Sequence, residues 1–212
     1  MIPIQKKITL VNRTLATSRK IEWIVIHYVG AVSTAENNVN YFYDKNVGKS
    51  AHYFIDENEI WQCVEEKDMS WHCGAEVYYN ECRNSNSIGI EMCCKRDENG
   101  ELYVDATTIQ NTIYLVRDIM KKYAINIENV VRHYDVTRKV CPVPFVEEES
   151  LWIRFKRRLE VMEITDVNEA LKYLEEKGRV TSREYWEKTI DCVKNQEFVF
   201  LKWANDLKEL LG

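Results

Sequence analysis

The stretch that decides the fold is Ile21-Glu-Trp-Ile-Val-Ile-His27. It is β-branched and almost entirely apolar, which predicts a strand buried on both faces at the centre of a sheet. Two further apolar stretches follow at 87–94 (Ser-Ile-Gly-Ile-Glu-Met-Cys-Cys) and 129–133 (Asn-Val-Val-Arg-His). Because helical patterns separate these strands, we predict an α/β fold with a single mixed central sheet flanked by helices.

Helix and turn signals lie between the strands. Ser33-Thr-Ala-Glu36 is a capping-box pattern that predicts a helix to about Asn46, and Thr107 with Gln110 forms a second one. A further helix is expected at 147–160, and the segments 52–56 and 60–64 read as a hairpin. Apolar residues at steps of four and three define the buried face of the second helix: Ile109, Ile113, Val116, Met120 and Tyr123.

The character of the sequence changes near residue 163. Strand signals stop there, and short helices are expected at 167–177, 182–193 and 197–211. We therefore predict one domain at 1–162 and a small all-helical domain at 163–212, which is close to the lower size at which a domain folds alone. Four aromatic residues mark this second part: Trp186, Phe198, Phe200 and Trp203.

Composition excludes several classes of protein. Of the 212 residues, 45% are hydrophobic and 30% charged, and the net charge of −5 argues against a nucleic-acid partner. No apolar run approaches the ~20 residues that a membrane span needs. The amino terminus has no charged segment followed by an apolar one, so we expect no signal peptide and synthesis in the cytoplasm. Seven cysteines without a regular spacing favour reduced thiols over a disulfide framework.

Three residues far apart in sequence form the most informative set. His27 and His133 each end an apolar run, and Cys141 follows eight residues later, before Pro142. Two imidazoles and one thiolate would hold one Zn²⁺ and leave its fourth position open, as in a catalytic site. Each residue taken alone is more often an ordinary core or surface residue than a ligand, and His52 and the His72-Cys73 pair are competing ligands.

Five motifs in order resemble the type-2 N-acetylmuramoyl-L-alanine amidases, the zinc family that includes phage endolysins and peptidoglycan recognition proteins. The resemblance covers residues ~20–160. The motifs are Ile-Val-Ile-His27, Ser-Ala-His-Tyr-Phe-Ile-Asp56, Trp71-His72-Cys-Gly74, Asn86-Ser-Ile-Gly-Ile-Glu91, and Arg132-His133-Tyr-Asp135 followed by Lys139-Val-Cys141-Pro142.

The resemblance implies that His27, His133 and Cys141 bind zinc and that Glu91 and Lys139 are catalytic. Strand alternation puts Glu91 on the opposite face from the neighbouring apolar residues. Some branches of the family carry a catalytic Tyr where this chain has Ala51, so Glu91 is expected to be the general base. Whether the nearby Tyr28 or Tyr53 contributes stays open.

Asn84 and Asn86 are candidates for hydrogen bonds to a peptide stem, with turn residues as the alternative. The family resemblance implies a substrate cleft lined by Trp71 and His72. It also implies hydrolysis of the bond between N-acetylmuramic acid and L-alanine in bacterial peptidoglycan by a phage or prophage endolysin, which reaches the wall after release from the cell. The helical domain would bind the cell wall or form a homodimer, unless its Trp186 and Trp203 are simply core residues. Two rival readings remain: a peptidoglycan-binding module without catalysis, and a structural zinc protein with a fourth ligand from His72 or Cys73.

Overall fold

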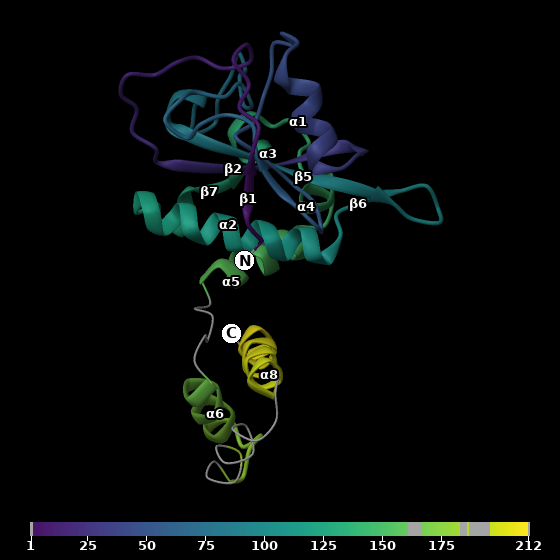
Figure 1. Ribbon diagram of the computed structural model, residues 1–212, viewed down its shortest axis with the longest axis vertical. Helices are drawn as coiled ribbons and strands as arrows, with labels where there is room; N and C mark the ends of the chain where they lie inside the picture. Colours follow the sequence, from purple (N-terminus) through teal and green to yellow (C-terminus); the bar gives the residue numbers. More distant parts are fainter. Residues whose placement is uncertain (1, 161–166, 183–185, 187–195, 212) are drawn as a thin grey trace. The chain divides into compact units, whose positions relative to one another are not determined.

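The computed structural model describes residues 2–160, 167–182, 186 and 196–211. The chain forms two units, Met1–Lys156 and Arg157–Gly212, which are drawn in Figure 1. The boundary falls inside helix α5 (Glu149–Glu160). The domain boundary that the sequence predicts, at residue 162, lies outside the described residues.

The first unit is built on a mixed sheet whose strand order is β1-β4-β3-β5-β2-β7, with β6 paired to the end of β5. The central strands β5, β2 and β7 run parallel, and β3 also pairs with β5 in parallel. β3 and β4 form the predicted antiparallel hairpin. The strands are β1 (Ile4–Lys6), β2 (Trp23–Val32), β3 (Tyr53–Ile55), β4 (Ile60–Gln62), β5 (Ser87–Arg96), β6 (Leu102–Tyr103) and β7 (Val130–Arg132).

Both faces of the sheet are covered, as the apolar central strands predict. Helix α1 (Ala35–Tyr43) packs on β3 and β4, whereas α2 (Ala106–Tyr123) packs on β3 and β5, and Figure 1 shows the two helices on either side of the sheet. Short elements complete the unit: η1 (Asn84–Asn86), η2 (Ile127–Asn129), α3 (His133–Thr137) and α4 (Val143–Glu147). The predicted α/β architecture is confirmed.

Several predicted helix ends are wrong, because contacts from distant residues decide them. α1 is capped by Thr34, and its first amide, on Ala35, also donates to the Asp56 carboxylate at 2.7 Å. The helix ends at Tyr43, whose carbonyl accepts a hydrogen bond from Thr9 Oγ1 at 2.9 Å. The cap of α2 is Asp105, two residues before the predicted cap Thr107.

The face that α2 buries also differs from the prediction. Ile113 and Val116 are buried, but Ile109, Met120 and Tyr123 are only half-buried. The residues that replace them in the core are Thr108, Asn111, Thr112, Leu115 and Ile119. Asn111 tolerates burial because its amide donates to the Asp56 carbonyl at 3.0 Å.

In the second unit, helices α6 (Val167–Glu176) and α8 (Gln196–Leu211) pack together. Their shared core consists of Ala170, Leu171, Leu174, Val180, Phe200, Ala204 and Leu207. Trp186 packs against this core, whereas 41% of Trp203 is exposed. The predicted helix at 182–193 lies almost wholly outside the described residues.

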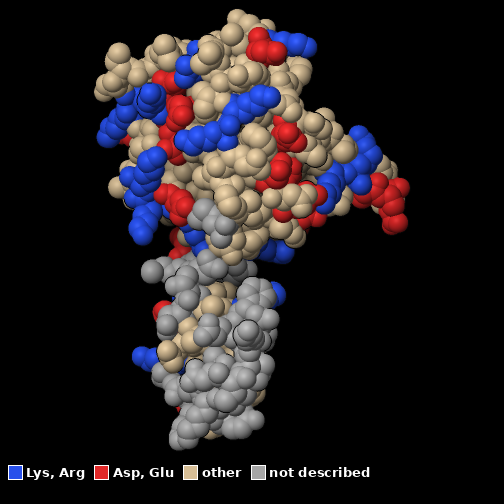
Figure 2. Space-filling model, in the orientation of Figure 1, with Lys and Arg blue, Asp and Glu red and all other residues tan. Residues whose placement is uncertain are grey.

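The visible surface of the first unit carries charged side chains of both signs (Figure 2). On the face shown in Figure 2, basic and acidic side chains of the first unit are interspersed rather than separated into a continuous basic surface. Among the described helices, none combines the length and apolar character needed to span a bilayer.

The described cysteines are all free and buried: Cys63, Cys73, Cys82, Cys93, Cys94 and Cys141.

Candidate active site

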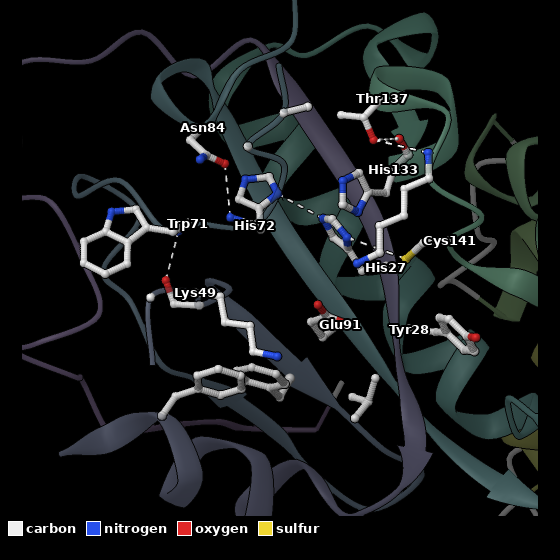
Figure 3. A pocket seen from close by; sticks show the side chains of 18 of the residues that line it. His27, Tyr28, Lys49, Trp71, His72, Asn84, Glu91, His133, Thr137 and Cys141 are labelled. Carbon is white, nitrogen blue, oxygen red and sulfur yellow. Dashed lines mark hydrogen bonds between the residues drawn. The ribbon is translucent and has the colours of Figure 1, made fainter. Parts of the chain in front are cut away.

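The three predicted ligands lie together at one end of the central strands. His27, His133 and Cys141 are all buried, and one ligand atom from each lies within 4.8 Å of the other two. Nδ1 of His27 is 3.8 Å from Sγ of Cys141, and the rings of His27 and His133 are 4.7 Å apart between centroids. Figure 3 shows the two imidazoles and the thiol facing a common point.

Strand pairing explains why these side chains meet. His27 in β2 is the register partner of Glu91 in β5, so both side chains lie on the same face of adjacent parallel strands. His27 is not at the end of its strand as predicted, since β2 continues to Val32 with a register irregularity after Tyr28. His133 does follow its strand directly, as the first residue of α3.

An ion pair that sequence reasoning missed fixes the start of α3. Two nitrogens of the Arg132 guanidinium contact the Asp135 carboxylate, at 2.9 and 3.1 Å, and the same carboxylate accepts the Arg132 backbone N–H at 2.9 Å. Arg132 is itself buried and also donates to the Phe145 carbonyl at 2.7 Å. Because His133 lies between these two residues, the pair holds the backbone that carries it.

The donor set fits a divalent metal ion. Burial lowers the pKa of His27 well below its usual value, and burial with the nearby Lys139 lowers the pKa of His133 to about 4, so both imidazoles are neutral, as metal ligands must be. Nδ1 of His133 is buried and has no hydrogen-bond partner among the described residues. Burial raises the pKa of the Cys141 thiol to about 12, so its proton must leave when a cation binds.

The competing ligands do not join this cluster within the described part of the chain. His72 contacts the opposite edge of the His27 ring, with its Nδ1 2.9 Å from His27 Nε2. The Cys73 thiol contacts Oδ1 of Asn84 at 3.2 Å. His52 donates from Nε2 to the Asp68 carbonyl at 3.1 Å. The described residues therefore bring together three potential metal ligands, His27, His133 and Cys141.

Glu91 faces the cluster from β5. Its Oε2 is buried, and the part of the chain that the structure describes offers it no hydrogen-bond partner. Burial raises the pKa of Glu91 to about 8, although the positive charges of Lys139 and Lys49 act to lower it. A carboxyl group with a pKa this close to neutral can both accept and release a proton. Lys49 was not singled out by sequence reasoning, because a loop lysine carries no distinctive pattern.

These residues line a cleft of about 770 Å³. Glu91, Lys139, Trp71 and His72 border it as expected, together with the exposed Lys49. Figure 3 shows the Trp71 indole on one side and the ligand cluster on the other. The cleft is therefore wide enough to admit a substrate beside the ligands.

The remaining candidate residues differ in whether they border the cleft. Asn86 does not line the cleft, and its amide bonds the Arg83 N–H and the Glu81 carbonyl within one loop. Asn84 does line it. Tyr28 borders the cleft, whereas Tyr53 is buried and donates to Glu66 at 2.8 Å.

Comparison with known proteins identifies the family of the first unit. A family model described as N-acetylmuramoyl-L-alanine amidase matches residues 17–144. The chain belongs to this amidase family. The match includes all three ligands, Glu91 and Lys139, but not the helical unit, so the family assignment concerns the first unit.

Individual relatives carry the same family name. The chain is 30% identical over 177 residues to "N-acetylmuramoyl-L-alanine amidase CwlL" of Bacillus licheniformis, an alignment that covers 76% of this chain and 47% of the relative. The chain thus spans about half the length of the curated relatives it matches. The structure of PlyL superposes with a TM-score of 0.66 at 26% identity, covering 77% of this chain and 100% of PlyL. A mutant endolysin from Bacillus subtilis gives a TM-score of 0.61 at 27% identity, covering 75% and 99%.

Proposed function

We propose that this amidase hydrolyses the amide bond between N-acetylmuramic acid and L-alanine in bacterial peptidoglycan, and that it does so with one Zn²⁺ ion. The observation that carries the proposal is the convergence of His27, His133 and Cys141 beside Glu91 in a cleft. Family membership over residues 17–144 supports the same reaction.

Zinc suits this set of ligands better than a harder cation does. Imidazole and thiolate are preferred by Zn²⁺, whereas Mg²⁺ and Ca²⁺ prefer oxygen. When bound, the ion supplies Lewis acidity that activates water near neutral pH and polarises the scissile carbonyl. Two neutral imidazoles and one thiolate leave a net positive charge at the site, so this acidity is retained.

Glu91 is the proposed general base and acid. Its carboxylate takes the proton of the attacking water and later gives it to the leaving amine of L-alanine. Burial favours the protonated form of Glu91, which makes the second transfer easy. The Lys139 ammonium acts on His27, His133, Cys141 and Glu91 electrostatically. Its proposed role is to stabilise the negative charge that develops on the carbonyl oxygen.

The biological setting that we propose is that of a phage or prophage endolysin. The likeness to PlyL and to a Bacillus subtilis endolysin supports this setting. Trp71 and His72 both border the cleft, and the Trp71 indole is the proposed contact with the substrate. We propose further that the helical unit binds the wall or another copy of the chain, since exposed Trp203 offers an aromatic surface for either.

The direct test is the release of new amino groups from purified cell walls. The protein should expose the amino group of L-alanine at the start of the stem peptide. It should lose this activity after treatment with a chelator and regain it when zinc is restored. The Cys141→Ser variant should release none. Binding to walls without release of amines would instead support a recognition module that has kept the fold.

A further inference from the structure

A chain of hydrogen bonds leads from Ser87, the first residue of the central strand β5, to the proposed ligand His27. Oγ of Ser87 donates to the Arg83 carbonyl at 2.6 Å and lies 3.0 Å from Nε2 of His72. Nδ1 of His72 then lies 2.9 Å from Nε2 of His27, whose other nitrogen faces Cys141. The contacts from His72 to His27 and from His27 to Cys141 can be followed in Figure 3.

The serine determines which way the protons point. A hydroxyl has one proton, and Ser87 gives it to the Arg83 carbonyl, so its oxygen accepts from His72 Nε2–H. A neutral imidazole protonated at Nε2 has its lone pair at Nδ1, and this lone pair accepts from His27 Nε2–H. Nδ1 of His27 is then unprotonated and turned toward the site of the metal.

The opposite arrangement would disable the ligand. If Ser87 donated to His72 instead, the Arg83 carbonyl would lose this donor, and His72 would carry its proton on Nδ1. That proton would bond Nε2 of His27 and leave a proton on Nδ1 of His27, where the cation must bind. The serine–carbonyl bond at 2.6 Å therefore favours the tautomer that can bind a metal ion.

The position of the His72 ring is fixed by the strand beneath it. A Cβ atom at Gly89 would lie 2.5 Å from Cγ of His72, so only glycine lets the ring lie against β5 at this point. Oδ1 of Asn84 accepts the backbone N–H groups of His72 and Cys73 at 3.1 and 2.9 Å. Ser87, Gly89 and Glu91 are alternate residues on one face of β5. Ser87 supplies the acceptor for His72, Gly89 leaves room for the His72 ring, and Glu91 supplies the carboxyl group of the site.

We propose that His72 is a positioning residue that accepts the Nε2–H bond of His27 and thereby directs Nδ1 of His27 to the metal ion. Both nitrogens of His72 are engaged within the protein, so neither is free to bind substrate. Outer partners of this kind change metal affinity by ~10- to 100-fold. The inference rests on the proposed metal site, so its test includes a measurement that needs neither metal nor activity.

Two variants of similar shape separate hydrogen bonding from packing. His72→Asn keeps an acceptor near the position of Nδ1. His72→Leu has a volume similar to that of His and no acceptor. With zinc affinity measured by chelator competition, we expect Leu to weaken binding ~10- to 100-fold and Asn to recover most of this loss. Equal affinity in the wild type and both variants would overturn the proposal, and so would equal weakening in both variants.

Nitrogen NMR of the metal-free wild-type protein tests the tautomer even where a variant fails to fold. The chain has four histidines, so the ring signals are few enough to assign. We expect His27 and His72 both to carry the proton on Nε2. A proton on Nδ1 of His27 would overturn the inference. If the expected tautomers are found but walls are not cleaved, the proposed function fails while the inference stands.

Discussion

The two units of the chain use their side chains in different ways. The first unit brings polar residues inside: His27, His133 and Cys141 are buried at the end of the sheet, beside the half-buried Glu91. The second unit buries an apolar core around Phe200, and Trp203 stays partly exposed. Buried polar groups without partners are costly, so they persist where a ligand or a reaction uses them. This contrast supports the proposal that catalysis is carried out by the first unit and attachment by the second.

The largest effect should come from Cys141→Ser. Replacing the thiolate with a hydroxyl removes the softest of the three ligands, and we expect zinc and activity to be lost together. Elemental analysis of the purified variant, alongside amine release from walls, measures both. A variant that stays folded and active with a full complement of zinc would show that Cys141 is not a ligand.

Glu91→Gln should separate catalysis from metal binding. Gln keeps the volume but cannot accept the proton of water, so kcat should fall by ~10²-fold or more while zinc content and fold stay the same. Steady-state kinetics on a soluble muramoyl peptide and circular dichroism provide the measurements. Full lysis of walls by this variant would rule out Glu91 as the base.

Lys139→Met should have a smaller effect on kcat. A preorganised donor to an oxyanion contributes ~10²–10³-fold, and an exposed, flexible lysine should contribute less, so we expect roughly a tenfold loss. Met keeps the length of the aliphatic chain and removes only the charge. Loss of zinc from this variant would contradict the role that we assign to Lys139.

The buried carboxyl group also predicts a dependence of stability on pH. The pKa of Glu91 is raised from 4.5 to about 8 in the folded metal-free protein. Its contribution to stability is therefore full below pH 4.5 and is lost as the pH rises through 8. Glu91→Gln has no charge to bury, so its Tm relative to wild type should rise between these two values and then level off.

Thermal melts of metal-free protein at several pH values measure this change. Glu101→Gln is the matched control, because Glu101 is exposed and its substitution should give a difference in Tm that does not vary with pH. A flat difference for Glu91→Gln as well would show that the Glu91 carboxylate is solvated.

The smallest catalytic effect is expected from Trp203→Ala in the second unit. Cleavage of a soluble muramoyl peptide should be unchanged, since the ligands and Glu91 all lie in the first unit. Pelleting of the full chain with purified walls should weaken if the helical unit binds the wall. Sedimentation of the free protein tests the alternative, in which the exposed Trp203 contacts a second copy. Unchanged behaviour in both assays would show that Trp203 has neither role.

Much of the first unit can be predicted from local sequence patterns. The apolar stretches identify the central strands, and alternation in β5 correctly separates Glu91 from Ile88 and Ile90. Motif order suggests the ligand set, and the structure brings those three side chains together. These features are predictable because strand periodicity and the types of the ligand residues can be recognised within short segments of the sequence.

Features that depend on distant contacts are not visible in the sequence. His72 lies 45 residues from His27, and its orientation depends on the open space over Gly89. The end of α1 depends on Thr9, and the position of Lys49 beside Glu91 depends on how a loop folds. The sequence therefore predicts that His72 lines the cleft, whereas its contacts favour a role as the hydrogen-bond partner of the proposed ligand His27.

The most direct test of the account is X-ray absorption spectroscopy of the zinc-loaded protein. The account predicts one sulfur at about 2.3 Å, two imidazole nitrogens at about 2.0–2.1 Å and one further light atom supplied by solvent. A second sulfur, which would bring in Cys73, or a third imidazole, which would bring in His72, would contradict it, because the position needed for substrate would then be occupied by the protein.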